Sequence, residues 1–402
     1  MKKYLAILLA LVMMLGLLTG CGSASTTGGS AATETPTVPS SSGENTGAEA
    51  AKEEQNSAKG YKLGALDLTA LGLSTFLTAD SVIRDLCETV GAEYITASLP
   101  GFDDAAFISA YESLIDQGCD GIMLYTFAEG PISLIADMME EAGVDWFLVN
   151  RQISDPALKE KVFSMDCFVG NSYCSEEDNA YNMVLELNQS LGVHNLAIIG
   201  LTQGDLNGDL RDKGIAHACE ESGVTLLTET RGIATVDDVT NAVEGIIATY
   251  PEVDGIFIVG GVVTTGALAG AAQALSNHGL SDKVSIAMVD IAAGMNEYMG
   301  QGQPLKLVTG GNLVMDQVIA AASMINHAMG VNVDEEPYVI NTHMLSIRTP
   351  EDAADYDEYC ENPDAPFVSG EQWFDTMIGK TLDEMRAFVD GFSIETAKAL
   401  RG

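Results

Sequence analysis

Basic side chains are scarce in this sequence. It has 19 lysine and arginine residues against 58 aspartate and glutamate residues, which gives a formal net charge of −39 over 402 residues. Binding to nucleic acid needs a basic surface, and broad adhesion to anionic lipid is disfavoured for the same reason. The charge identifies no ligand, because acidity in an exported domain mainly serves solubility.

Closely spaced cysteines of the C-x-x-C kind are missing. Beyond Cys21, six cysteines are scattered over apolar helices and strand ends: Cys87, Cys119, Cys167, Cys174, Cys219 and Cys360. This scatter predicts no zinc site. Export would permit disulfides, with Cys167 and Cys174 as the local pair to consider, but buried free thiols are the simpler interpretation in a domain of this size.

The common catalytic signatures are also missing. No Gly-x-Ser-x-Gly appears, Gly260-Gly261 is not followed by Gly-Lys-Ser/Thr, and the five histidines show no ligand spacing. The stretch from Asp205 to Asp209 resembles the start of a calcium loop, but Leu210 takes the place of the required glycine. We therefore predict no catalytic residue, no metal and no cofactor, which makes an exported enzyme the weakest hypothesis.

Long apolar runs are absent except at the start of the chain. Lys2 and Lys3 precede an apolar run from Leu5 to Leu18, which ends in Thr19-Gly20-Cys21. This order is typical of an export signal, and the run is shorter than the ~20 residues of a membrane span. The segment resembles the lipobox of bacterial lipoproteins, in which the cysteine is acylated after cleavage. We predict a lipoprotein signal peptide at 1–21 with Cys21 as the lipidation site; an uncleaved membrane helix is the alternative.

The next segment, 22–60, consists mostly of Gly, Ser, Thr, Ala, Pro and Glu. Such a composition buries too little apolar surface to offset the entropy of ordering, so it predicts a disordered tether. Some 340 residues remain beyond it, enough for two lobes with their own cores.

From Tyr61 onward, short apolar strands alternate with helical patterns of ten or more residues. Strands are predicted at 61–66, 94–97, 121–125 and 146–149, and the pattern repeats with strands at 195–200, 225–227, 255–259 and 285–289. Such alternation indicates βαβ units around parallel sheets. The fold class predicted is α/β, with two doubly wound parallel-sheet lobes.

Local motifs add a family resemblance. They are Asp116–Ile122 at a helix-to-strand step, Leu148–Gln152 at a strand end, Arg211 with Gly214 at a helix start, and Val289-Asp290. In this order they resemble the ribose-type (class I) periplasmic binding proteins, from Tyr61 to about Tyr338. The resemblance implies a ligand cleft between two lobes joined by three crossing strands, near 168–171, 308–312 and 336–340.

The implied lobes follow from these crossings. The N-terminal lobe would comprise 61–170 plus about 312–337, and the C-terminal lobe 171–311 plus about 338–345. Residues 346–402 form an extension that the family core normally lacks. It is acidic and has apolar residues at helical spacing, so we expect helices that dock on a lobe rather than bind a partner.

The candidate ligand-binding residues follow predicted strands or begin helices. Ligands of parallel sheets bind beyond the carboxyl ends of the strands, and Arg151 and Asp290 occupy such positions, one in each lobe. A guanidinium fork and a carboxylate suit a polyhydroxylated ligand. The remaining candidates share these edges: Arg211, Asn171, Phe76, Ser74, Tyr125, Phe127, Asn312 and Gly260. Each could instead be solvated or brace its own lobe.

Two departures from the sugar-binding pattern bear on the ligand. Sugar-binding members usually have Asn-Asp after the strand at 255–259, where this chain has Gly260-Gly261 followed by two valines. The first loop keeps only Phe76 of the usual Asn-Asn-Pro-Phe. We therefore expect a site less polar than a pentose site, and another small nutrient or a signalling molecule stays open.

The resemblance implies a lipid-anchored, extracytoplasmic solute-binding protein at the cell membrane, in the cell envelope. Such a protein would be a monomer that captures a sugar or sugar-like ligand and delivers it to an ABC importer permease, with no nucleic acid as partner. The alternative is a ligand-sensing lipoprotein that signals to a membrane receptor kinase.

Overall fold

The computed structural model describes residues 57–201, 204–233, 235–260, 264–292 and 294–402. The predicted signal, Cys21 and the tether up to residue 56 lie outside the described residues, as do 261–263. Within these described ranges, no helix is both long enough and apolar enough to cross a membrane.

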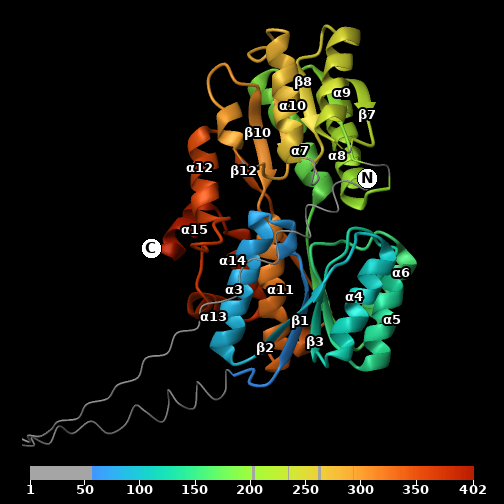
Figure 1. The fold of residues 1–402 in the computed structure, drawn as a ribbon, viewed down its shortest axis with the longest axis vertical. Coiled ribbons are helices and arrows are strands. Elements are labelled where there is room, and N and C mark those ends of the chain that lie inside the picture. Colours follow the sequence, from blue (N-terminus) through green and yellow to red (C-terminus); the bar gives the residue numbers. More distant parts are fainter. Residues whose placement is uncertain (1–56, 202–203, 234, 261–263, 293) are drawn as a thin grey trace, which may run out of the picture. The chain divides into compact units, whose positions relative to one another are not determined.

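The first lobe is built around a six-stranded parallel sheet (Figure 1). Its elements are β1 (Lys62–Asp67), η1 (Thr69–Leu71), α3 (Ser74–Val90), β2 (Glu93–Ser98), α4 (Asp104–Asp116), β3 (Gly121–Leu124), α5 (Ile132–Ala142), β4 (Asp145–Leu148), α6 (Pro156–Phe163) and β5 (Phe168–Cys174), and later α11 (Asn312–Ala328), η3 (Val333–Glu335) and β11 (Tyr338–Thr342). The strand order is β11-β5-β4-β3-β1-β2. The central strands β3 and β4 are almost wholly buried, as expected for a sheet covered on both faces.

The second lobe repeats the plan with its own six-stranded sheet. Its elements are α7 (Glu176–Leu191), β6 (Asn195–Ile199), α8 (Leu206–Ser222), β7 (Thr225–Thr230), α9 (Val236–Thr249), β8 (Gly255–Ile258), α10 (Thr264–Asn277), β9 (Ser285–Val289), η2 (Met295–Tyr298), β10 (Leu305–Gly310) and β12 (Leu345–Ile347). The order is β12-β10-β9-β8-β6-β7, and only β12 runs antiparallel to its neighbour. The prediction of two α/β lobes with parallel sheets is confirmed.

The chain passes between the lobes at three places, and at two of them the lobe boundary differs from the predicted one. The passes follow β5, β10 and β11, at 174–176, 310–312 and 342–345. We predicted that the first lobe ends at 170, but β5 continues in its sheet to Cys174. We assigned about 338–345 to the second lobe, but Tyr338–Thr342 pairs along β5 in the first. A strand pattern is local and does not reveal which sheet supplies the partner strand.

All six cysteines in the described part of the chain, Cys167 and Cys174 included, are free thiols. Burial raises the pKa of Cys87 and of Cys360 to about 12, which keeps both thiols protonated and unreactive. In the same ranges, no group of three or more His, Cys, Asp or Glu side chains is arranged to hold a metal ion.

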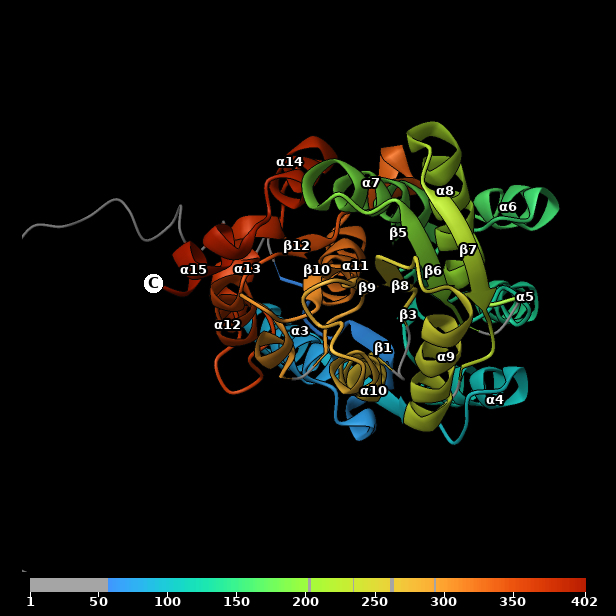
Figure 2. The same ribbon diagram turned by 90° about the horizontal axis from the view of Figure 1, so that it is seen from above.

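We predicted that the C-terminal extension begins at residue 346, but Ser346 and Ile347 pair with β10 as part of β12 in the second lobe. The extension therefore begins at residue 348 and forms α12 (Pro350–Tyr359), α13 (Gly370–Met377), α14 (Leu382–Asp390) and α15 (Ile394–Arg401). Capping boxes start the first three of these helices. The helix α12 packs against η2 of the second lobe and against α15, whereas α13 packs on α3 and α14 on β11 of the first lobe (Figures 1 and 2). The extension therefore contacts both lobes.

Trp373 anchors the extension on the first lobe. Its side chain is fully buried, and its indole Nε1 donates a hydrogen bond to the Val318 carbonyl at 3.1 Å. Its ring meets Phe367 and Phe388 edge-on, at centroid distances of 6.0 and 5.5 Å.

We expect Trp373→Ala to lower the free energy of unfolding by about 3–5 kcal/mol, the usual cost of emptying a large aromatic site. Urea unfolding followed by circular dichroism measures this change. Leu134→Ala, at a side chain that is half exposed, is the control. Equal small losses in both variants would show that the extension is not part of the cooperative core.

Candidate functional site

Arg151 is held rigidly at the carboxyl edge of the first sheet. The preceding Asn150 has a positive φ of 53°, which turns the chain away from β4. Arg151 Nε donates to the Thr126 carbonyl at 2.5 Å, and Nη1 donates to Asn150 O and Oδ1 at 2.7 and 2.9 Å. The guanidinium also lies over the Tyr125 ring, 5.0 Å from its centroid. These contacts fix the orientation of the fork with neutral oxygens and a ring.

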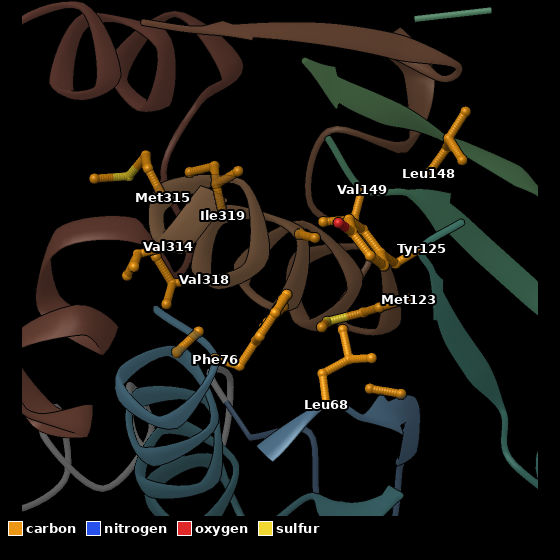
Figure 3. Packing of buried hydrophobic residues seen from close by; sticks show 14 of the residues in the cluster. Leu68, Phe76, Met123, Tyr125, Leu148, Val149, Val314, Met315, Val318 and Ile319 are labelled. Carbon is orange, nitrogen blue, oxygen red and sulfur yellow. The ribbon is translucent and has the colours of Figure 1, made fainter. Parts of the chain in front are cut away.

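Aromatic side chains continue from this point along the same edge. Phe76 and Tyr125 are buried and meet edge-on at 6.2 Å, and Tyr125 meets the half-buried Phe127 at 5.5 Å. Figure 3 shows Phe76 and Tyr125 with Met123 and other apolar side chains of the core. The rings therefore pack in the hydrophobic core and also form the apolar surface next to Arg151.

The second lobe brings three predicted residues together: Arg211, Asp290 and Gly260. Arg211 is buried on α8, donates from Nε to Glu176 Oε2 at 2.7 Å and from Nη1 to the Val259 carbonyl at 2.6 Å, and lies 3.7 Å from Asp290 Oδ2. A Cβ at Gly260, where φ is 109°, would lie 2.5 Å from Arg211 Nη1. Gly260 therefore makes room for the guanidinium.

Burial raises the pKa of Glu176, and the neighbouring Arg211 opposes this rise. The pair therefore depends on mutual neutralisation, because a lone buried charge is costly. Burial also raises the pKa of Tyr125; Arg151 lowers it, while the carboxylates of Asp290 and Asp205 raise it.

Asn171 lies between Arg151 and the first pass between the lobes. Its Nδ2 donates to the Arg151 carbonyl at 2.9 Å. Its Oδ1 is buried and has no hydrogen-bond partner among the described residues. A buried acceptor without a donor costs free energy, so Asn171 offers an acceptor that a ligand hydroxyl could satisfy.

Asn312 belongs to a polar network around Asp316, which is fully buried on α11. Asp316 Oδ2 accepts from Asn150 Nδ2 at 2.6 Å, from Thr342 Oγ1 at 3.2 Å and from Asn312 Nδ2 at 3.4 Å. Burial raises the pKa of Asp316 to about 6, although hydrogen bonds from Asn150, Ser172 and Thr342 lower it. Asn312 therefore braces the passes between the lobes.

Ser74 is engaged by the C-terminal extension. Its hydroxyl donates to Glu361 Oε2 at 2.9 Å, and Thr75 Oγ1 donates to Glu361 Oε1 at 2.6 Å. Glu361, Asp316 and Glu176 are not among the predicted site residues. No local signal marks them, since Glu361 is 287 residues from Ser74 and lies in a generally acidic stretch.

A family model described as a periplasmic binding protein domain matches residues 68–327. No curated protein matches the chain.

Solved structures share the fold. The chain is similar to a periplasmic sugar-binding protein from Pseudomonas fluorescens, with a TM-score of 0.66 and 14% identity over 84% of this chain and 99% of that one. It is also similar to an ABC transporter solute-binding protein from Bacillus halodurans C-125 with bound myo-inositol, with a TM-score of 0.57 and 16% identity over 75% and 98%. A third, from Burkholderia graminis C4D1M in complex with D-arabinose, has a TM-score of 0.60 and 16% identity over 72% and 96%.

The raised pKa of Asp316 predicts a pH dependence of stability. The folded state favours the protonated form of Asp316, so the protonated carboxyl stabilises the fold. This stabilisation is fully present below the unfolded pKa of 3.8 and is lost as pH rises through about 6. Asp316→Asn cannot ionise. The unfolding free energy of Asp316→Asn minus that of wild type should therefore rise by roughly 2–3 kcal/mol from about pH 4 to pH 7.

Denaturant unfolding at both pH values measures the change. Asp282→Asn, which removes an exposed carboxylate, controls for the loss of one charge. A difference between Asp316→Asn and wild type that does not change with pH would contradict the assignment of a buried carboxyl with a raised pKa.

Proposed function

Because the chain belongs to the periplasmic binding protein domain family, we propose that it captures a sugar or sugar-like polyol between its two lobes. It then delivers this ligand to an ABC importer permease. The family consists of solute-binding proteins, which hold their ligands without transforming them. The working form is a monomer, and each lobe supplies one edge of the site.

The observation that carries the proposal is the group around Arg151. The guanidinium is oriented by three hydrogen bonds and a ring. Asn171 donates from Nδ2 to the Arg151 carbonyl, and its Oδ1 has no hydrogen-bond partner in the part of the chain that the structure describes. A polyol hydroxyl can accept from a guanidinium and donate to an amide oxygen in one arrangement. Tyr125 and Phe76 supply an apolar wall for the C–H face of a sugar ring.

Ligands named in solved structures of the same fold support the choice of an uncharged polyol. Myo-inositol and D-arabinose are two of these, and D-allose is bound in a protein from Actinobacillus succinogenes 130z. All are neutral and densely hydroxylated. The geometry around Arg151 suits that chemistry, because each hydroxyl can both donate and accept.

Anchoring is part of the proposal and rests on the sequence alone. Cys21 ends the apolar start of the chain, and the segment predicted as a tether, residues 22–60, follows it. Acylation at Cys21 would hold the two lobes at the outer side of the cell membrane, within reach of a permease.

We expect Arg151→Ala to leave the fold largely intact and to weaken ligand binding by about 1.5–3 kcal/mol, the range for hydrogen bonds to charged groups. Arg151→Lys should not restore full affinity, because an ammonium lacks the planar fork. A thermal-shift screen that includes myo-inositol, D-arabinose and D-allose selects the ligand, and titration calorimetry measures its affinity.

Arg348→Ala is the matched control, since Arg348 is exposed and pairs with Glu186 on α7. Equal affinities of wild type and Arg151→Ala would remove Arg151 from the site. If no sugar or polyol stabilises the wild-type protein, the proposed ligand class is wrong.

We expect Cys21→Ser to abolish lipid-dependent retention at the membrane, because a hydroxyl cannot replace the thiol in a thioether. Metabolic labelling with palmitate and membrane fractionation compare the variant with wild type. Cys167→Ser, which alters a cysteine within the first lobe, should keep the label. A labelled Cys21→Ser protein would show that the lipobox interpretation is wrong.

A further inference from the structure

The C-terminal extension places a carboxylate at the start of α3. Glu361 is buried, with 6% of its surface exposed. Its oxygens accept hydrogen bonds from Ser74 and Thr75 and, at 2.5 Å, from the Tyr356 hydroxyl. The Tyr356 side chain also packs against Gly311, where the chain passes between the lobes. Glu361 therefore lies at the predicted ligand-facing end of the first lobe.

The helix α3 has no cap of its own. Its N-cap residue is Leu73, which makes no side-chain cap hydrogen bond, and its first turn contains no acidic residue. The N-terminus of a helix favours negative charge, because its amide groups and macrodipole point there. Glu361 therefore already supplies the anion that this position would otherwise attract from solution or from a ligand.

The charges around the candidate site are unevenly distributed. Arg151 and Arg211 are cations at the candidate site, and Glu176, Asp205, Asp290 and Glu361 are carboxylates at or near it. Arg211 is paired with Glu176 at 2.7 Å and lies 3.7 Å from Asp290. Burial raises the pKa of Glu361, its three hydroxyl partners lower it, and the charge of Asp290 raises it further. The two carboxylates, from the extension and the second lobe, therefore influence each other.

We propose that Glu361 is a specificity-determining residue, through which the C-terminal extension makes the site select neutral polyols and reject carboxylated or phosphorylated ones. This inference rests on the proposed function. A carboxylate in the ligand would find the start of α3 occupied by a like charge, and buried charges are screened less by salt than exposed ones. Arg151 is then left to bind neutral hydroxyls.

Titration calorimetry with two matched pairs tests the inference: D-galactose with D-galacturonate, and D-glucose with D-glucuronate. In each pair only a ring substituent changes from a hydroxymethyl to a carboxylate. Wild type should bind at least one neutral sugar and bind its acid at least about tenfold more weakly. Glu361→Gln keeps the side-chain volume and removes the charge, so it should strengthen binding of the acid by about tenfold and leave the neutral sugar within about twofold.

Glu186→Gln is the matched control, because Glu186 pairs with Arg348 of the extension and lies on α7 of the second lobe. It should leave the selectivity unchanged. Thermal unfolding of each variant shows that it is folded, and the comparison in wild type needs no variant at all.

The outcomes separate the two proposals. Equal binding of sugar and acid by wild type, or unchanged rejection of the acid by a folded Glu361→Gln, overturns the role of Glu361 alone. If Glu361→Gln weakens binding of the neutral sugar and does not strengthen binding of the acid, the role of Glu361 is also overturned, because the effect of the variant is then purely structural. If wild type binds neither of these two neutral sugars nor any other polyol, both proposals fail together.

Discussion

The buried carboxylate of Asp316 is the constraint on which the two-lobed arrangement depends. The chain passes between the lobes three times, and each pass has a group near Asp316. Ser172 lies on β5 before the first pass, Asn312 begins α11 after the second, and Thr342 ends β11 before the third. Asn150 joins the same carboxylate to the turn that carries Arg151. The orientation of Arg151 is therefore tied to the geometry of the passes.

Each lobe accommodates a buried arginine in a different way. Taking a guanidinium out of water is costly unless its hydrogen bonds are replaced. Arg211 is neutralised by Glu176 and Asp290, whereas Arg151 is held by carbonyl and amide oxygens and by the Tyr125 ring. The first lobe therefore presents a cation whose charge is less fully cancelled, which suits a hydroxyl acceptor on a ligand.

The C-terminal extension is integrated with both lobes. Trp373 inserts beside α11 in the first lobe, and Arg348 makes two hydrogen bonds to Glu186 in the second. Between these anchors, Glu361 reaches the start of α3. Helices that cover a lobe also bring a charged group to the candidate site, so packing and selectivity come from the same segment.

The sequence by itself determined the alternation of strands and helices, because buried parallel strands and amphipathic helices leave local periodic patterns. It also placed Arg151, Asp290 and Gly260 correctly after strands, and the carboxyl ends of parallel strands necessarily share an edge. Tertiary structure alone decided that β11 pairs with β5, that Gly260 makes room for Arg211, and that Glu361 binds Ser74. These contacts join residues up to 287 positions apart. Their hydrogen bonds depend on how whole elements pack, which no local pattern of residues records.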